Sequence, residues 1–199
     1  MKARIQQRIT ENLDRVKNLV RIYETHLMGS GSGRRGHLET DVLRAATVFL
    51  HAAMEDFLRN LAYWKLPEAS SAVIDEIPIA GSEGNKKKFW LGELVVHKGK
   101  TVDDLIKESV NEYLERSNYN NAAEISSFLE SIAVDVTKVN GNFSVLEELM
   151  QRRHQIVHRA DRDETGGYGV HRVRSIGRSS LRRWIGAVEE FSTHVLNKL

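Results

Sequence analysis

The sequence predicts an all-α fold, a helical bundle of about five to six helices that forms a single domain over residues 1–199. Apolar residues recur every three or four positions along several long segments, which is the period of a helix with one buried face. Strand-like alternation is scarce and no internal repeat is present. With 199 residues and 41% hydrophobic content, the chain is long enough to bury one sizeable core.

Two long helices are predicted in the first third of the chain. Residues 2–27 place their apolar side chains on one stripe, with charged residues elsewhere. A Gly/Ser-rich loop, 29–37, interrupts this pattern and is expected to be a flexible connector. Its glycines also admit a phosphate-gripping loop, although the Gly-Lys-Ser/Thr ending of a P-loop is absent. Residues 39–65 are apolar on nearly every side, as expected for a central helix, and Pro67 ends them.

The middle of the chain is predicted to be an irregular insertion followed by shorter helices. Residues 66–100 mix prolines, glycines and short apolar runs, which indicates loops and short helices. Trp90, beside a lysine run, admits two interpretations: a base-stacking contact on an RNA path, or a buried aromatic ring next to a solvated tip. A helix start at Thr101 introduces a helix over about 101–116, and a shorter one is expected from residue 120 or 121 to about 133.

The last third is predicted to contain two further helices. Ser144 and Glu147 form a capping-box pattern, in which a hydroxyl and a carboxylate satisfy the first free backbone amides, after a turn at 140–141. This helix is expected to end in the polar, glycine-bearing loop 161–169. A final helix from about Arg178 carries an apolar stripe made of Leu181, Trp184, Ile185, Val188, Phe191, Val195 and Leu196.

Composition excludes several classes of protein and bears on location. The chain has no cysteine, which excludes disulfides and thiolate zinc sites. It has neither an apolar leader nor a long uncharged span, so no secretory signal and no membrane-spanning segment is expected. A cytoplasmic location is therefore the default expectation.

Charge is unevenly distributed, although the net charge is only +2. Residues 101–150 contain ten acidic and three basic side chains, whereas 152–183 contain nine arginines, three acids and no lysine. Arginine offers planar, bidentate donors that match a phosphate, so this segment suits a nucleic-acid backbone. It equally suits a solvated, salt-bridged face, or pairing with the acidic segment within the bundle or across a dimer. A DNA-binding interpretation lacks a recognisable helix-turn-helix pattern.

The segment 151–159, Gln-Arg-Arg-His-Gln-Ile-Val-His-Arg, carries residues suited to cleaving RNA without a metal or cofactor. Such cleavage needs a base for the 2′-hydroxyl, an acid for the leaving 5′-oxygen and positive charge at the transition state. His158 can exchange a proton near neutral pH and Arg153 can hold the non-bridging oxygens, while Arg152 or His154 assists. The expected product is a 2′,3′-cyclic phosphate, which DNA cannot form.

Helical geometry leaves other interpretations of these residues open. At about 100° per residue, Arg153 and His158 point about 140° apart, whereas His154 and His158 share one stripe. The two histidines could hold a metal with Asp161 or Glu55 as a third ligand, although the glutamate that follows the first histidine of helical zinc proteases is absent. The histidines and Arg153 could also serve only to hydrogen-bond the bundle together.

The motif resembles the signature of the HEPN superfamily of helical RNA-cleaving proteins, which is an arginine, a polar residue, and a histidine four to six positions beyond the arginine. Arg153, His154 and His158 fit this pattern, with histidine in the polar slot where asparagine is commoner. Arg152 also fits, with one more intervening residue. Residues 50–59 resemble the second helix of the RiboL-PSP-HEPN subgroup, where an acidic residue lies on an otherwise apolar helix.

The resemblance implies an HEPN-like bundle with metal-independent endoribonuclease activity, no cofactor, and a toxin–antitoxin or anti-phage defence role. It also implies a homodimer with the active cleft at its interface, RNA as the substrate, and an antitoxin or other regulatory partner. The competing function is a non-catalytic, RNA- or protein-binding dimeric module, because catalytically inert relatives occur.

The resemblance also favours supporting roles for residues outside the motif. His51 or Glu55 would approach Arg153 or His158 and orient it, whereas the alternative is an internal hydrogen-bond ladder from His51 through Glu55 to Arg59, spaced every four residues. The residues expected to contact nucleic acid are Arg159, Arg162, Arg172 and Arg174.

Overall fold

A computed structural model describes residues 1–29, 37–82, 90–135, 140–163 and 173–199 of the chain. Within these ranges the α-helices are α1 (Lys2–Ile22), α2 (His37–Lys65), α3 (Ser71–Ile74), α4 (Val102–Arg116), α5 (Ala122–Ser131), α6 (Asn140–Arg159) and α7 (Arg178–Lys198). Three further helical segments are a π-helix, Tyr23–Leu27, and two 3₁₀ helices, Leu66–Glu68 and Leu91–His97.

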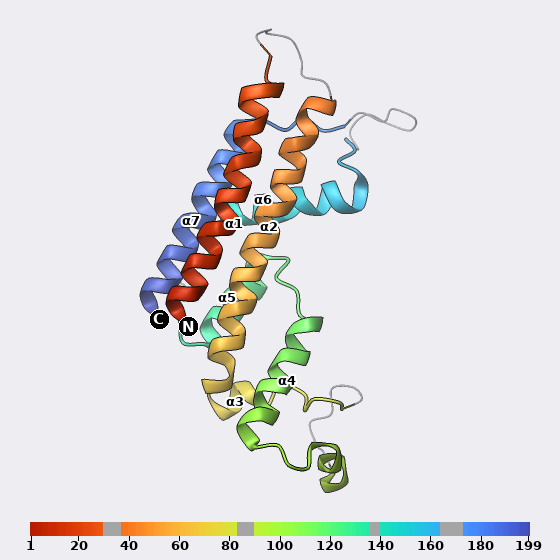
Figure 1. Cartoon of the computed structure of the whole chain (residues 1–199), viewed down its shortest axis with the longest axis vertical. Helices are drawn as coiled ribbons and strands as arrows, with labels where there is room; N and C mark the ends of the chain where they lie inside the picture. Colours follow the sequence, from red (N-terminus) through yellow and green to blue (C-terminus); the bar gives the residue numbers. More distant parts are fainter. Residues whose placement is uncertain (30–36, 83–89, 136–139, 164–172) are drawn as a thin grey trace.

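Three long helices lie side by side along the longest axis of the molecule. As Figure 1 shows, α1 runs in one direction, α2 and α7 return in the other, and the two ends of the chain meet at one end of this layer. Helix α6 crosses the layer, packs against both α2 and α7, and extends past α2. Helix α4 packs against the C-terminal half of α2.

Apolar stripes of the long helices build one continuous core. On α1 the buried residues are those that the spacing predicts, from Ile5 to Val20, and Tyr23 continues the stripe. Helix α2 lies at the centre, with Leu43, Leu50 and Leu61 fully buried. Because removing such a side chain from water contributes about 1.5–3 kcal/mol, these stripes position α6 and everything on it.

The all-α prediction is confirmed for the described residues, which contain only one isolated bridge, Arg162 to Val173, and no strand. The number of helices is not matched, because seven α-helices are present there against the predicted five to six. One of them, Ser71–Ile74, is a single turn inside the predicted irregular insertion. Most of the predicted loop 29–37 lies outside the described residues.

The capping box predicted at Ser144 and Glu147 is wrong. Helix α6 begins at Asn140, so Ser144 lies inside the helix and not at its N-cap. The ring centroids of Phe143 and Phe191 on α7 are 6.3 Å apart, and this contact favours helical structure in the residues before Ser144. The carboxylate of Glu147 accepts instead from the backbone N–H of Ala122, at 2.9 Å, and so ties the start of α5 to α6.

Other predicted helix starts are confirmed by their caps. The hydroxyl of Thr101 accepts from the N–H of Asp104 and the Asp104 carboxylate accepts from the N–H of Thr101, which closes a capping box on α4. The side chain of Asn121 caps α5 by accepting from the N–H of Glu124 at 2.8 Å.

The insertion presents apolar side chains to solvent. Trp90 is 81% exposed, which corrects the interpretation of this ring as a buried aromatic. Leu91 is equally exposed, and Val96 is 74% exposed. No helix within the described ranges combines the length and apolar character needed to cross a bilayer.

Candidate functional site

The C-terminal half of α6 carries the motif 151–159 and extends beyond α2 (Figure 1). Buried Leu146, Leu149 and Met150 anchor the helix, and its next turn presents motif side chains in different directions. Arg152 is buried, Arg153 is half-buried, and His154 and His158 are exposed. The three adjacent positions 152–154 therefore meet different environments, because each residue turns the helix by about 100°.

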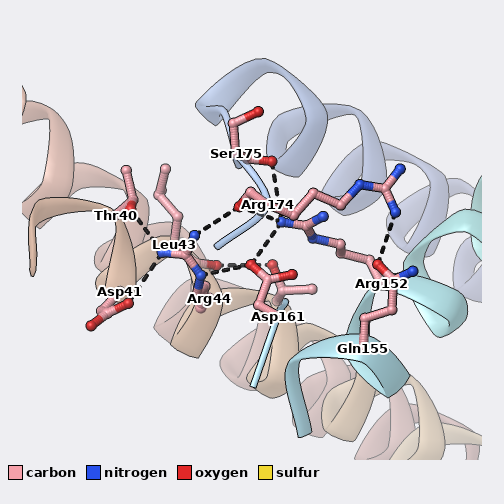
Figure 2. Close-up of polar contacts among 10 residues, drawn as sticks. Thr40, Asp41, Leu43, Arg44, Arg152, Gln155, Asp161, Arg174 and Ser175 are labelled. Atoms are coloured by element: carbon pink, nitrogen blue, oxygen red, sulfur yellow. Dashed lines mark hydrogen bonds and ion pairs between the residues drawn. The ribbon is translucent and has the colours of Figure 1, made fainter. Parts of the chain in front are cut away.

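Arg152 is held inside the protein by a buried carboxylate. Its guanidinium donates to Asp161 Oδ2 at 2.8 Å and to the backbone oxygens of Arg174 and Ser175, both at 3.1 Å (Figure 2). Burial lowers the pKa of Arg152 and the charge of Asp161 opposes that effect, yet an arginine stays protonated in proteins. The side chain thus fixes α6 to the segment that leads into α7.

A second arginine, Arg44 on α2, shares the same carboxylate. Its Nε donates to Asp161 Oδ2 at 2.7 Å, and its terminal nitrogens donate to Thr40, Asp41 and the backbone oxygen of Arg174. Asp161 is only 1% exposed, so the pairing takes place away from solvent. Figure 2 shows how this network, called here the Arg44–Asp161–Arg152 cluster, joins α2, α6 and the segment before α7.

The chain leaves α6 through two residues with left-handed backbone. Ala160 and Asp161 have φ values of 48° and 56°, a region that costs non-glycine residues about 1–3 kcal/mol each. Hydrogen bonds compensate: the N–H of Asp161 donates to Gln155 O at 3.0 Å, and the N–H of Arg174 donates to Asp161 O at 2.8 Å. The Arg44–Asp161–Arg152 cluster therefore sets where α6 ends and where His158 is presented.

The ladder predicted on α2 forms only in part: Arg59 and Glu55 are hydrogen-bonded, whereas His51 and Glu55 are too far apart for a hydrogen bond. Arg59 donates to Glu55 at 3.0 Å and to backbone oxygens of Leu114 and Ser117 on and after α4. The Glu55 carboxylate lies 3.8 Å from His51 Nδ1, and His51 is 2% exposed. Burial, reinforced by the charge of Arg153 and opposed by Glu55, lowers the pKa of His51 to about 4. At neutral pH His51 is therefore uncharged and forms no ion pair with Glu55.

Arg153 is the motif arginine without a fixed partner. Its guanidinium makes no hydrogen bond or ion pair with any described residue, but its charge acts on His51. No hydrogen bond or ion pair among the described residues joins His51 or Glu55 to Arg153 or His158, so an orienting role for His51 or Glu55 stays a prediction.

The two histidines form an exposed pair on the outer face of α6. The ring centroids of His154 and His158 are 4.7 Å apart, with the planes inclined at 42°. The metal interpretation finds no third ligand, because Asp161 is paired with two guanidiniums and Glu55 with Arg59. No group of three histidine, aspartate or glutamate side chains suited to a metal occurs in the described part of the chain.

The arginines predicted to contact nucleic acid lie around the end of α6. Arg159 is its last residue and is exposed, and Arg162 is exposed in the next turn. Arg174 is exposed and donates to Gln155 Oε1 at 2.9 Å. Arg172 lies outside the described residues.

Comparison with known proteins shows which family the chain belongs to. A sequence model of the RiboL-PSP-HEPN family matches residues 10–199, which is nearly the whole chain. The chain belongs to the RiboL-PSP-HEPN family. No curated protein and no solved structure matched it.

Two residues of this HEPN domain were not identified from the sequence as parts of one cluster. Arg44 is the only Asp, Glu, Lys or Arg between Val42 and Met54, a mostly apolar stretch of α2, and a lone charge there indicates a buried partner. That partner is Asp161, which the sequence suggested only as a metal ligand. Their separation of 117 positions along the chain explains why spacing alone does not reveal the pair.

The lowered pKa of His51 makes the stability of the HEPN domain depend on pH. The unfolded chain binds a proton below about pH 6.5, whereas folded His51 binds one only near pH 4, so stability is complete above pH 6.5 and falls as the pH drops toward 4. The loss is about 3 kcal/mol at most, from about 1.4 kcal/mol per pKa unit. Urea unfolding at pH 7.5 and 4.5 should give a lower free energy of unfolding at pH 4.5 for the wild type. The difference between the two pH values should be smaller for His51→Gln.

The same histidine reports on Arg153. Replacing Arg153 with Gln removes a positive charge that lowers the pKa of His51, so the pKa should rise. An NMR titration of the His51 ring protons measures it, with Arg4→Gln, an exposed arginine on α1, as the control. An unchanged His51 pKa in Arg153→Gln contradicts the contact.

Proposed function

We propose that the protein is a metal-independent endoribonuclease that cleaves RNA by attack of the 2′-hydroxyl. The supporting observation is that Arg153, His154 and His158 form no hydrogen bond or ion pair with any described residue, whereas adjacent Arg152 is fully engaged. Side chains without a partner among the described residues are available to a substrate, whereas the guanidinium of Arg152 is already occupied by partners within the protein. Membership of the RiboL-PSP-HEPN family supports the same function, because HEPN domains are often ribonucleases and commonly bind RNA.

The chemistry follows from these side chains. A histidine takes the proton from the 2′-hydroxyl, the 2′-oxygen forms a bond to phosphorus, and the bond to the 5′-oxygen breaks. The leaving 5′-oxygen receives a proton from a second acid, and the product is a 2′,3′-cyclic phosphate. His158 is assigned the proton transfer, with His154 beside it, and Arg153 stabilises the charge on the non-bridging oxygens. Arg159, Arg162 and Arg174 would contact the backbone on either side.

From the family's usual setting we propose that this activity is that of a toxin or an anti-phage effector in the cytoplasm. Uncontrolled RNA cleavage harms the cell that makes the enzyme, so an antitoxin or another regulatory partner would restrain it. Genes that neighbour this one, together with co-purification of a product that blocks cleavage, test the assignment.

The active cleft is proposed to lie at the interface of a homodimer. On one α6, Arg153 faces the half-buried side near His51 while His158 faces solvent, about 140° away. A second copy related by a two-fold axis can bring its own α6 alongside, so that one cleft takes Arg153 from one subunit and His158 from the other.

The activity itself is tested with purified wild-type protein, RNA and excess EDTA. We expect fragments ending in 2′,3′-cyclic phosphate, and no cleavage of DNA with the same sequence, which lacks the nucleophile. Cleavage that EDTA abolishes would contradict the mechanism. Fragments whose 5′ ends lack a hydroxyl group would contradict it as well.

The shared cleft is tested by mixing two inactive variants. Arg153→Ala and His158→Ala, dissociated and re-associated together, form mixed dimers in half of all pairings, and each mixed dimer has one intact cleft of two. Activity should therefore recover to about a quarter of the wild-type value. No recovery, with mixed dimers demonstrated by mass spectrometry, would place both residues of a cleft in one subunit.

One observation favours a second function, a non-catalytic module that binds RNA or protein. The charge of half-buried Arg153 lowers the pKa of buried His51, and an arginine with only a structural role would have the same effect. In that case RNA would bind and remain intact, and Arg153→Ala would change stability without changing any cleavage.

A further inference from the structure

A cavity of about 300 Å³ lies between α6 and the start of α7, and Arg153, His154 and His158 are not among the residues that line it. Its size is at the lower end for sites that hold small ligands. Its walls are mostly polar, and they comprise Glu148, Gln151, Arg152, Gln155, Arg174, Ser175, Ile176, Ser180, Arg183 and Trp184.

The cavity walls carry a surplus of positive charge. Three arginines face one carboxylate, Glu148, whose only partner among them is Arg183 at the exposed rim. At the buried end, Arg152 is close enough to Arg174 and Arg44 for their charges to act on it, and Asp161 is the one buried carboxylate among the described residues that compensates them. An anion entering the cavity would therefore be attracted by uncompensated guanidinium charge.

Hydrogen-bond donors without acceptors add to this charge. Helix α7 has Gly177 at its N-cap and no side-chain cap, so the amides of its first turn, including that of Ser180 on the cavity wall, have no recorded acceptor among the described residues and can bind an external one. Trp184, 5% exposed, also lines the cavity, and its indole N–H is buried without an acceptor among the described residues. An oxygen-rich anion in the cavity can accept from these amides, whereas the indole nitrogen has almost no accessible surface, so Trp184 serves as a neighbouring reporter of binding.

The cavity is adjacent to the face of α6 that presents the histidines. Gln151 and Gln155 line it, and His154 and His158 each follow one of them by three residues. Positions three and four residues apart are neighbours on a helix surface, with about 5–6 Å between Cβ atoms. A group in the cavity thus lies beside the histidine pair, on the α7 side.

We propose that this cavity is a phosphate-binding subsite that holds a backbone phosphate of RNA, next to the phosphodiester that the histidines address. Arg183 leaves Glu148 to bind the phosphate, Arg174 binds it from the opposite wall, and the first-turn amides of α7 complete its shell. The assignment to RNA rests on the proposed function, whereas the phosphate chemistry does not. The same shell would also accept the phosphate monoester of a free nucleotide.

Inorganic phosphate is the first ligand to test, with the indole N–H signal of Trp184 followed by NMR and assigned with Trp184→Phe. Arg183→Ala should raise the Kd for phosphate about tenfold or more, because a hydrogen bond to a charged group is lost. Glu148→Gln should lower the Kd, by up to about fivefold, because it frees Arg183 from a surface ion pair. Arg182→Ala, the adjacent arginine, which pairs with Glu24 at 2.6 Å, is the matched control and should leave the Kd unchanged.

The opposite signs separate a binding site from a structural ion pair. If Arg183 and Glu148 only stabilise the fold, both substitutions lower stability and neither changes phosphate binding in the expected direction, which overturns the proposal. Unfolding measurements on each variant confirm that it is folded under the titration conditions.

A second arm identifies the source of the phosphate, using His158→Ala so that RNA is not consumed. An oligonucleotide without terminal phosphates should compete with inorganic phosphate for the Trp184 signal, and Arg183→Ala should reduce the salt dependence of its binding by about one phosphate contact. Competition by a mononucleotide alone overturns the backbone assignment. Because none of these readings requires cleavage, a failed ribonuclease assay and a failed subsite give different results.

Discussion

Replacing His158 or Arg153 with Ala is expected to reduce RNA cleavage by about 10²–10⁴-fold, the range typical of a lost proton-transfer or charge-stabilising group. His158 is exposed, so its loss creates no cavity and should not destabilise the fold. Arg153 has no ion pair with a described residue, so the guanidinium is also dispensable for folding. Initial rates on a labelled RNA in EDTA measure the loss.

Surface residues of the same types provide matched controls. His26→Ala and Arg4→Ala remove an exposed histidine and an exposed arginine from the first helical segment, at positions outside the motif. Both should cleave at the wild-type rate, and identical purification of all variants excludes a contaminating nuclease. If His158→Ala and Arg153→Ala cleave RNA as fast as these controls, the assignment of the active site is wrong.

Replacing Asp161 with Asn is expected to destabilise the protein by about 3–5 kcal/mol, because it removes the buried counter-charge of two buried guanidiniums, of which Arg44 keeps only the exposed Asp41. Oδ2 of this carboxylate accepts from both Arg44 and Arg152, at 2.7 and 2.8 Å. The amide has nearly the same shape, so lost charge and not lost volume is responsible. Urea unfolding near neutral pH measures the difference in free energy.

Asp56→Asn is the control for this substitution. Asp56 pairs with Arg8 at 2.8 Å, but both side chains are partly exposed, at 29% and 56%, so the expected cost is below about 1 kcal/mol. Equal effects of Asp161→Asn and Asp56→Asn would show that the Arg44–Asp161–Arg152 cluster does not hold α6. The cluster also fixes the end of α6, so Asp161→Asn should lower cleavage even at temperatures where the variant is folded.

Much of the fold could be predicted because helix periodicity is a local property of the chain. The stripe of α7 from Leu181 to Leu196 is buried as predicted, and the helix starts at Arg178. Caps made by neighbouring residues, at Thr101 and Asn121, were equally accessible to prediction. The helix start predicted at Ser144 was wrong because a capping pattern is also compatible with a helix interior. Packing of Phe143 on Phe191 favoured the longer helix.

The candidate site was only partly predictable. The motif on α6 and the ladder on α2 are visible as spacings of four to five residues. The different environments of Arg152 and Arg153 are not, because either arginine fits the motif and burial depends on what lies opposite each. The cavity beside Arg183 combines residues from two helices and the segment between them, so no single stretch of sequence indicates it.

By itself the sequence determined the helical class, the positions of most helices and the family signature on α6, since each is encoded by residues within a few turns of one another. Only the tertiary structure decided that Arg152 is buried against Asp161 and Arg44 while Arg153 keeps a guanidinium without a described partner. It also decided that His51 is neutral, through burial and the charge of Arg153 on another helix. The physical reason is that desolvation and charge pairing depend on distances in space, which helices far apart in the sequence set only when they pack.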